Sequence, residues 1–211
     1  MVKVKICGIT NLEDAQATIK AGCDALGFVF YRRSPRFVSR QKAKEIIRQL
    51  PKKVLRVGVF VNAPEKTIKK IAKTCALDIL QFHGREPPEF CQRFKNYKII
   101  KAFRVKGSLD LKEIARYKVF ACLFDSFQRK KFGGTGKNFS WQLLKGLTAL
   151  RQLIFLSGGL NQRNVRQAIS IVHPQWVDVS SSVEIKPGLK NHHKVRRFIQ
   201  TAKGGRRDER N

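Results

Sequence analysis

The chain has 211 residues, 42% of them hydrophobic, and this length and composition suit one domain with a complete core. No apolar run reaches the roughly 18 residues of a membrane span, and no signal-peptide segment is present, so we expect a cytoplasmic protein with no membrane partner. The 44 Lys and Arg far outnumber the 15 Asp and Glu, and the net charge of +29 favours anionic substrates or polyanionic partners.

Strand-like and helix-like segments alternate along the whole chain. The predicted strands cover residues 3–7, 24–30, 53–61, 78–82, 97–103, 119–124, 153–156 and 176–179. The predicted helices cover residues 10–21, 39–50, 62–76, 86–94, 109–117, 141–147, 161–171 and 191–202. Eight such units predict an α/β fold, a single-domain (β/α)8 TIM barrel with a parallel sheet. The alternative, an open doubly wound sheet, lacks its Gly-x-Gly-x-x-Gly turn after the first strand.

The ends of the helices carry recognisable signals. Thr10 and Glu13 have the spacing of a capping box at the start of the first helix, and Gly22 marks its end. Asn161 is expected to cap the helix that follows the seventh strand. We assign residues 1–203 to the barrel and residues 204–211 to a basic, disordered tail.

The first strand places a lysine inside the barrel. Side chains alternate along a strand, so Lys5 and Cys7 share one face, and a Cys7 that leans into the barrel mouth puts Lys5 beneath it. A buried lysine needs a partner. Asp178 is the acidic residue of the eighth strand, which neighbours the first in a closed barrel, and we therefore predict a Lys5–Asp178 ion pair.

Candidate catalytic residues stand where the strands end. Cys7 ends the first strand, and in isolation it is either a small buried hydrophobe or a base or nucleophile. Asp125 ends the sixth strand, across the mouth, where a carboxylic acid and a thiolate form an acid–base pair. Arg36 lies in the loop after the second strand and is suited to bind a carboxylate. Gln81 and His83 share inward parity at the end of the fourth strand.

Two turns resemble phosphate-binding turns. Ser157-Gly158-Gly159 follows the seventh strand and Ser180-Ser181-Ser182 follows the eighth. Barrel enzymes commonly bind a phosphate at these two turns through backbone N–H groups. The five cysteines are odd in number, widely spaced and without a Cys-x-x-Cys pair, so we expect no disulfide framework and no metal site.

Taken together, the motifs resemble those of the phosphoribosylanthranilate isomerase family of tryptophan biosynthesis. The resemblance runs from about residue 2 to residue 198. It is carried by Lys-Ile-Cys-Gly-Ile-Thr at 5–10, Gly-Phe-Val-Phe-Tyr with Ser-Pro-Arg at 27–36, Gln-Phe-His-Gly at 81–84, Asp125 with Gly-Gly-Thr-Gly-Lys at 133–137, Ser-Gly-Gly-Leu-Asn at 157–161 and Asp-Val-Ser-Ser at 178–181.

The resemblance implies an Amadori rearrangement of N-(5'-phosphoribosyl)anthranilate, without cofactor or metal. It implies Asp125 as general acid and Cys7 as general base. The helix start after Cys7 and the positive charge of the chain are expected to favour the thiolate. The substrate-binding residues implied are Arg36, which would clamp the anthranilate carboxylate, Gln81, His83 and Asp178. The phosphate-binding residues implied are Gly158, Gly159, Ser181 and Ser182.

One departure from the family and two alternatives stay open. The family usually has glycine at position 182. Ser182 is strained if that glycine needs a positive φ, or it adds a hydroxyl donor. A histidine-pathway aminoaldose isomerase is disfavoured by Cys7, because that family uses two aspartates. A nucleic-acid-binding barrel is disfavoured because no stacking strip or RNA motif accompanies the charge. The chain is expected to be a monomer or a homodimer.

Overall fold

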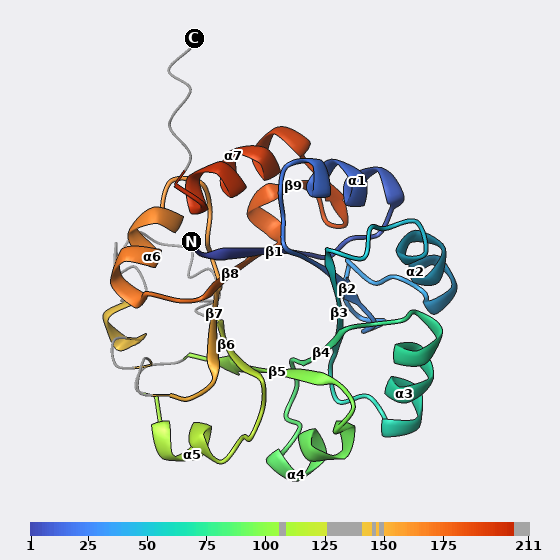
Figure 1. Cartoon of the computed structure of the whole chain (residues 1–211), viewed down its shortest axis with the longest axis vertical. Coiled ribbons are helices and arrows are strands. Elements are labelled where there is room, and N and C mark those ends of the chain that lie inside the picture. Colours follow the sequence, from blue (N-terminus) through green and yellow to red (C-terminus); the bar gives the residue numbers. More distant parts are fainter. Residues whose placement is uncertain (106–108, 126–140, 145–146, 148–149, 205–211) are drawn as a thin grey trace.

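A closed barrel of eight parallel strands forms the centre of the molecule (Figure 1). The structure, a computed structural model, describes residues 1–105, 109–125, 141–144, 147 and 150–204. Each strand pairs with its neighbours in sequence, and β8 pairs with β1 to close the ring. The predicted (β/α)8 barrel is therefore confirmed. The strands are β1 (Lys3–Cys7), β2 (Ala25–Val29), β3 (Leu55–Phe60), β4 (Ile79–Phe82), β5 (Lys98–Arg104), β6 (Ala121–Asp125), β7 (Leu153–Ser157) and β8 (Trp176–Val179).

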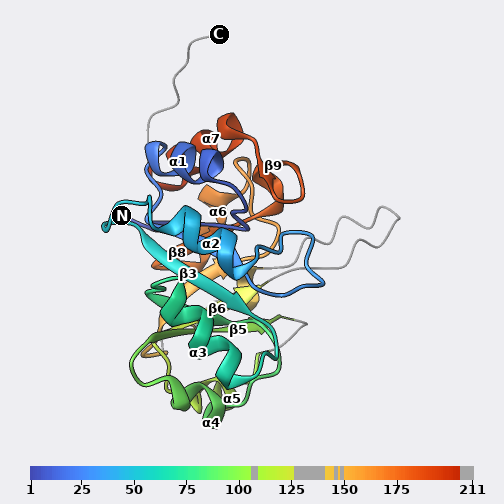
Figure 2. The same cartoon turned by 90° about the vertical axis from the view of Figure 1, so that its right-hand side faces the viewer.

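Helices surround the barrel on its outside, as Figures 1 and 2 show. The α-helices are α1 (Leu12–Lys20), α2 (Arg40–Ile47), α3 (Glu65–Thr74), α4 (Pro88–Cys91), α5 (Leu111–Ala115), α6 (Val165–Val172) and α7 (His192–Ala202). Short 3-10 helices are η1 (Gln92–Phe94), η2 (Trp141–Leu144) and η4 (Ser181–Val183). Within the described ranges, no helix is long and apolar enough to cross a bilayer.

A small antiparallel hairpin, absent from our prediction, lies between β8 and α7. It consists of β9 (Glu184–Lys186) and β10 (Leu189–Lys190), which pair with each other and not with the barrel. Gly188 forms its turn with a φ of +83°, a conformation that glycine adopts without strain. Because each strand is so short, its period-2 pattern is too brief to stand out from a loop.

The apolar core has two layers, as expected for this fold. Inside the barrel, Phe155 and Trp176 stack with ring centroids 4.8 Å apart, among small and branched side chains from the other strands. A larger layer packs the outer face of the sheet against the helices. The inner layer leaves the carboxyl ends of the strands to polar side chains.

Lys5 and Asp178 form the predicted ion pair inside the barrel. Their backbones are in register across β1 and β8, and Lys5 Nζ lies 2.7 Å from Asp178 Oδ1. Burial is the largest single effect and lowers the pKa of Lys5, but the attraction and hydrogen bonds of Asp178 and Cys7 together outweigh it, so the pKa of Lys5 is raised. The predicted pair is therefore confirmed, between residues that are 173 positions apart in the chain.

Two of the predicted helix caps are wrong, and one is confirmed. The N-cap of α1 is Asn11, whose side chain accepts from the Asp14 N–H, so the capping pair sits one residue after the predicted Thr10–Glu13 pair. The N-cap of α6 is Asn164 and not Asn161, because the chain first makes an extra turn in which Asn161 Oδ1 accepts from the backbone N–H of residue 163. Gly22 follows the end of α1 with a φ of +93°, as predicted.

Several expected segments lie outside the described residues. These are the Gly-Gly-Thr-Gly-Lys segment at 133–137, parts of the helix expected over 141–147, and residues 205–211 of the expected tail.

Candidate active site

The candidate acid and base each end a barrel strand. Cys7 is the last residue of β1 and Asp125 is the last residue of β6. The carboxyl ends of the strands in a (β/α)8 barrel form one face, where catalytic groups gather. Cys7 is 8% exposed, and the Asp125 side chain is 19% exposed. Both predicted residues therefore belong to the same end of the barrel and are nearly enclosed.

Gly27 makes room for the Cys7 sulfur. The two residues are partners across β1 and β2, and a Cβ added at Gly27 would lie 2.7 Å from Cys7 Sγ. The carbonyl of Cys7 is also held, because it accepts from Ser180 Oγ at 3.0 Å and from Lys190 Nζ at 2.6 Å. Cys7 is therefore fixed from both neighbouring strands.

The pKa of the Cys7 thiol is raised above its ordinary value. Burial is the largest effect and raises the pKa of the Cys7 thiol, the Lys5 ammonium lowers it, and the Asp178 carboxylate raises it again. The expected stabilisation of the thiolate is outweighed: Lys5 and Lys190 lower the pKa of Cys7, as positive groups should, but burial raises it more. Helix α1 begins at Leu12 and not directly after Gly8, and Lys5 is already paired with Asp178.

A chain of polar side chains leads from the barrel interior to Asp125. Gln81 Nε2 lies 3.0 Å from His83 Nδ1, and His83 Nε2 lies 3.4 Å from Asp125 Oδ2. Gln81 is buried and His83 is partly exposed, in agreement with their predicted inward parity. This arrangement places an imidazole beside the candidate acid, with its other nitrogen held by an amide.

Arg36 reaches the same end of the barrel over Gly8. A Cβ added at Gly8 would lie 2.7 Å from Arg36 Cδ, so the aliphatic stem of Arg36 rests directly on this turn. Its guanidinium is bound by Glu184, with Nε 2.9 Å from Oε1 and Nη2 2.6 Å from Oε2. Arg36 is thus a partly exposed cation with a fixed orientation, resting on the turn that directly follows Cys7.

The Ser182 side chain links the two predicted phosphate-binding turns. Gly158 and Gly159 have φ values of +84° and +68°, so both need glycine or strain. Ser182 lies in η4, and it is not among the described non-glycine residues with positive φ. The strain considered for Ser182 is therefore absent, and its hydroxyl donates to the carbonyl of Leu160 in the other turn.

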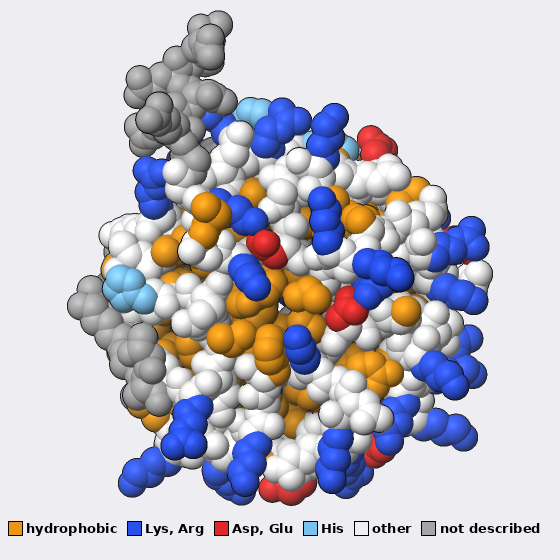
Figure 3. Space-filling model, in the orientation of Figure 1, with side chains coloured by type: hydrophobic (Ala, Val, Ile, Leu, Met, Phe, Trp, Pro, Cys, Tyr) orange, Lys and Arg blue, Asp and Glu red, His pale blue; other side chains and the backbone are white. Residues whose placement is uncertain are grey.

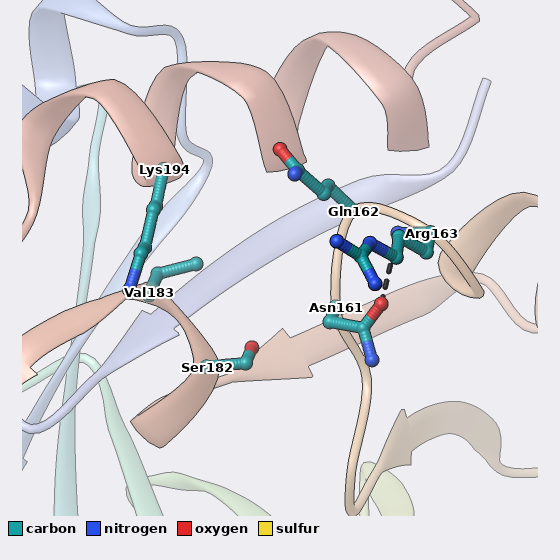
Figure 4. Close-up of a pocket in the computed structure, with 6 residues that line it drawn as sticks. All are labelled: Asn161, Gln162, Arg163, Ser182, Val183 and Lys194. Carbon is teal, nitrogen blue, oxygen red and sulfur yellow. Dashed lines mark hydrogen bonds between the residues drawn. The ribbon is translucent and has the colours of Figure 1, made fainter.

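A pocket of about 230 Å³ adjoins these turns. Figure 4 shows Lys194 extending from α7 on one side and Arg163, in the loop before α6, on another, with the Ser182 hydroxyl pointing between them. Figure 3 shows Lys and Arg side chains distributed around one whole face of the molecule, with few acidic ones. The pocket is lined by Asn161, Gln162, Arg163, Ser182, Val183 and Lys194.

Three residues important for this geometry were not singled out from the sequence. Gly27 was quoted only as part of a motif, although its place opposite Cys7 follows once the strand register is known. Glu184 and Lys190 belong to the unpredicted hairpin. In the part of the chain that the structure describes, no three His, Cys, Asp or Glu side chains gather as a metal-binding group.

The fold and these side chains define a (β/α)8-barrel enzyme whose candidate acid and base stand at the carboxyl ends of its strands. A family model described as N-(5'-phosphoribosyl)anthranilate (PRA) isomerase matches residues 4–201. The N-(5'-phosphoribosyl)anthranilate isomerase of Geobacter sulfurreducens is 49% identical over 204 residues, which are 97% of this chain and 100% of that protein. The chain belongs to the phosphoribosylanthranilate isomerase family, and it is an aldose–ketose isomerase of tryptophan biosynthesis.

Solved structures of this family have the same fold. The phosphoribosylanthranilate isomerase of Thermotoga maritima superposes with a TM-score of 0.90 at 45% identity, covering 97% of this chain and 100% of that one. A second structure superposes with a TM-score of 0.88 at 43% identity and the same coverage, and it is a complex with reduced 1-(o-carboxyphenylamino)-1-deoxyribulose 5-phosphate.

Proposed function

We propose that the chain converts N-(5'-phosphoribosyl)anthranilate to 1-(2-carboxyphenylamino)-1-deoxyribulose 5-phosphate, with Asp125 as general acid and Cys7 as general base. The observation that carries the proposal is the placement of Cys7 and Asp125 at the ends of β1 and β6, on one face of the barrel. Family membership supports the reaction type.

Two of the proton transfers in this reaction are assigned to side chains. Asp125, protonated, donates to the ring oxygen of the furanose, and the C1′–O bond breaks to give a Schiff base. Cys7, as thiolate, then removes the proton from C2′, and the resulting enolamine tautomerises to the ketone. Burial raises the pKa of the Cys7 thiol and so disfavours the thiolate, which is the form that acts as the base. Lys5 is a nearby cation that lowers this pKa and so assists the loss of the proton.

The remaining residues bind the two anionic ends of the substrate. Arg36 binds the anthranilate carboxylate, and its guanidinium, held by Glu184 at the turn after β1, supports this role. Gln81 and His83, which are hydrogen-bonded to each other, contact the substrate near Asp125. Asp178 is the fourth substrate-binding residue, and it also forms the ion pair with Lys5. The phosphate is bound by the backbone of Gly158, Gly159, Ser181 and Ser182.

The test follows the fluorescence of the anthranilate substrate during turnover. We expect Cys7→Ala and Asp125→Asn to lower kcat by about 10² to 10⁴, the usual contribution of general acid–base groups. Cys23→Ala and Asp110→Asn are matched controls, since Cys23 is a buried thiol outside the site and Asp110 is the N-cap of α5. Near-normal turnover by either site variant would refute its assigned role.

The wider setting of the enzyme is also proposed. Residues 1–203 act as one catalytic domain without cofactor or metal, in the cytoplasm, as a monomer or homodimer; a Thermotoga maritima relative is described as dimeric. The partner is a phosphorylated anionic small molecule. A steeply salt-dependent affinity for duplex nucleic acid without isomerase turnover would instead favour the nucleic-acid alternative.

A further inference from the structure

We infer that the β9–β10 hairpin orients the substrate-binding groups: Glu184 positions Arg36 for carboxylate binding, and Lys190 positions the backbone of Cys7. Neither residue is assigned a contact with the reacting atoms, so both are positioning residues. The inference rests on the proposed function, because it concerns how the anthranilate carboxylate is recognised.

Glu184 binds one edge of the Arg36 guanidinium and leaves a second edge available for a ligand. Its carboxylate accepts from Nε at 2.9 Å and from Nη2 at 2.6 Å, and its side chain is 4% exposed against 21% for Arg36. A guanidinium has five N–H donors in a rigid plane. Nη1 and Nη2 each direct one N–H along the Nη1–Nη2 edge, which Glu184 does not occupy, so a second carboxylate can bind there in bidentate fashion.

The Lys190 side chain links Glu184 to the carboxyl end of β1. Its side chain is fully buried, and Nζ donates to Glu184 Oε1 at 2.8 Å, to the Cys7 carbonyl at 2.6 Å and to the Ser180 carbonyl at 3.4 Å. Three acceptors match the three donors of an ammonium group. Lys190 therefore connects the hairpin to the ends of both β1 and β8.

The charges of this cluster suit an anionic substrate. Arg36 and Lys190 are cations and Glu184 is an anion, so the cluster keeps one net positive charge after Arg36 has been immobilised. Burial is the largest single effect and raises the pKa of Glu184, but the hydrogen bonds and the attraction of Arg36 and Lys190 together outweigh it, so the pKa of Glu184 is lowered. A rotamer that is already ordered costs less entropy when the substrate binds.

The hairpin itself is fastened to the catalytic end of β1. Thr10 Oγ1 donates to the Gly188 carbonyl, and the Gly188 N–H donates to Glu184 Oε1 at 3.3 Å. The backbone N–H of Lys190 donates to Asp14 in α1 at 2.8 Å. These contacts hold Glu184 and Lys190 in place independently of Arg36, as a positioning role requires.

The experiment separates carboxylate recognition from general damage. Two ligands are titrated by calorimetry: reduced 1-(o-carboxyphenylamino)-1-deoxyribulose 5-phosphate and the same compound without the carboxylate. For Glu184→Gln we expect about tenfold weaker binding of the carboxylated ligand, about 1.4 kcal/mol, and less than twofold change for the other. KM should rise by a similar factor while kcat changes less.

Glu86→Gln is the matched control. Glu86 is an equally buried carboxylate that accepts from Lys101 at 3.0 Å and from backbone N–H groups on the other side of the barrel. We expect its loss to lower stability without changing the ratio of the two affinities. Glu184→Asp, which keeps a carboxylate on a shorter stem, should give an intermediate ratio and serves if Glu184→Gln does not fold.

A double-mutant cycle with Arg36→Gln completes the test. If Glu184 acts through Arg36, Glu184→Gln should add nothing to the carboxylate preference already lost in Arg36→Gln. The inference would be overturned if Glu184→Gln weakened the binding of both ligands equally, or if the effects of the two substitutions were additive. The proposed function would still stand in that case, provided that the wild type turns over the substrate. A wild type that neither binds the ligands nor turns over substrate would overturn both.

Discussion

Gly27→Ala tests whether the position of the Cys7 sulfur is decisive. A Cβ at residue 27 would lie 2.7 Å from Cys7 Sγ, 3.1 Å from its Cα and 3.2 Å from its Cβ. Ordinary contacts between such atoms are about 3.5–4.0 Å. The sulfur or the strand must therefore move by roughly 1 Å. Gly27 lies within β2 and is not among the glycines with positive φ, so the backbone itself accepts alanine.

The expected cost falls on catalysis more than on stability. A displacement of about 1 Å from a reactive geometry can lower a rate by about 10²-fold, which is about 2.7 kcal/mol of activation free energy. Overpacking a strand contact costs about 1–3 kcal/mol of unfolding free energy. We therefore expect Gly27→Ala to fold, to bind the substrate carboxylate and phosphate nearly normally, and to lose about 10²-fold in kcat.

Gly58→Ala is the matched control. Gly58 also lies within a barrel strand, β3, but its added Cβ would clash with Leu77 Cδ1 and with the Phe60 ring in the apolar core. This variant should lose stability in urea unfolding and keep kcat per folded molecule. If Gly27→Ala retains kcat within about twofold while folded, the position of the Cys7 sulfur does not limit the reaction, and the argument from this contact fails.

Three further predictions concern charge and the phosphate turns. Lys5→Met leaves the Asp178 carboxylate buried without its partner and should lower the unfolding free energy by about 3–5 kcal/mol, as measured in urea. Ser182→Gly removes the hydroxyl donated to Leu160 and should cost about 1 kcal/mol of stability without lowering KM, because Ser182 is not strained. Since burial raises the Cys7 pKa, kcat/KM should increase with pH through the neutral range, and alkylation of Cys7 by iodoacetamide should follow the same curve. A pH-independent rate would show that another group removes the C2′ proton.

The strand order and the inward side chains could be predicted because both follow from local rules. Alternation of strands and helices requires a parallel sheet, and eight units close it. Parity along a strand then decides which side chains face inward, and the Lys5–Asp178 pair follows from parity and closure together. These inferences need no knowledge of loops.

The contacts made by loops could not be predicted in the same way. Glu184 and Lys190 meet Arg36 and Cys7 through a hairpin whose strands are too short to show a pattern. The helix caps were displaced because several Asx, Ser and Thr side chains near each helix start compete for the same N–H groups. The direction of the Cys7 pKa required knowledge of burial, which motif spacing does not contain.

The raised pKa of the Cys7 thiol is explained by its burial and by the ion pairs of the two lysines near it. Lys5 and Lys190 each lower the pKa of Cys7, but each is bound to a carboxylate, Asp178 or Glu184. A cation paired in this way exerts a weaker net field on a third group, so the burial of the sulfur is not offset. Burial lowers the pKa of Lys190, whereas the pKa of Lys5 is raised, so the two cations are not equivalent. The same ion pairs hold the carboxyl ends of β1 and β8 in place, so Cys7, the base that we propose, has a fixed position but a raised pKa.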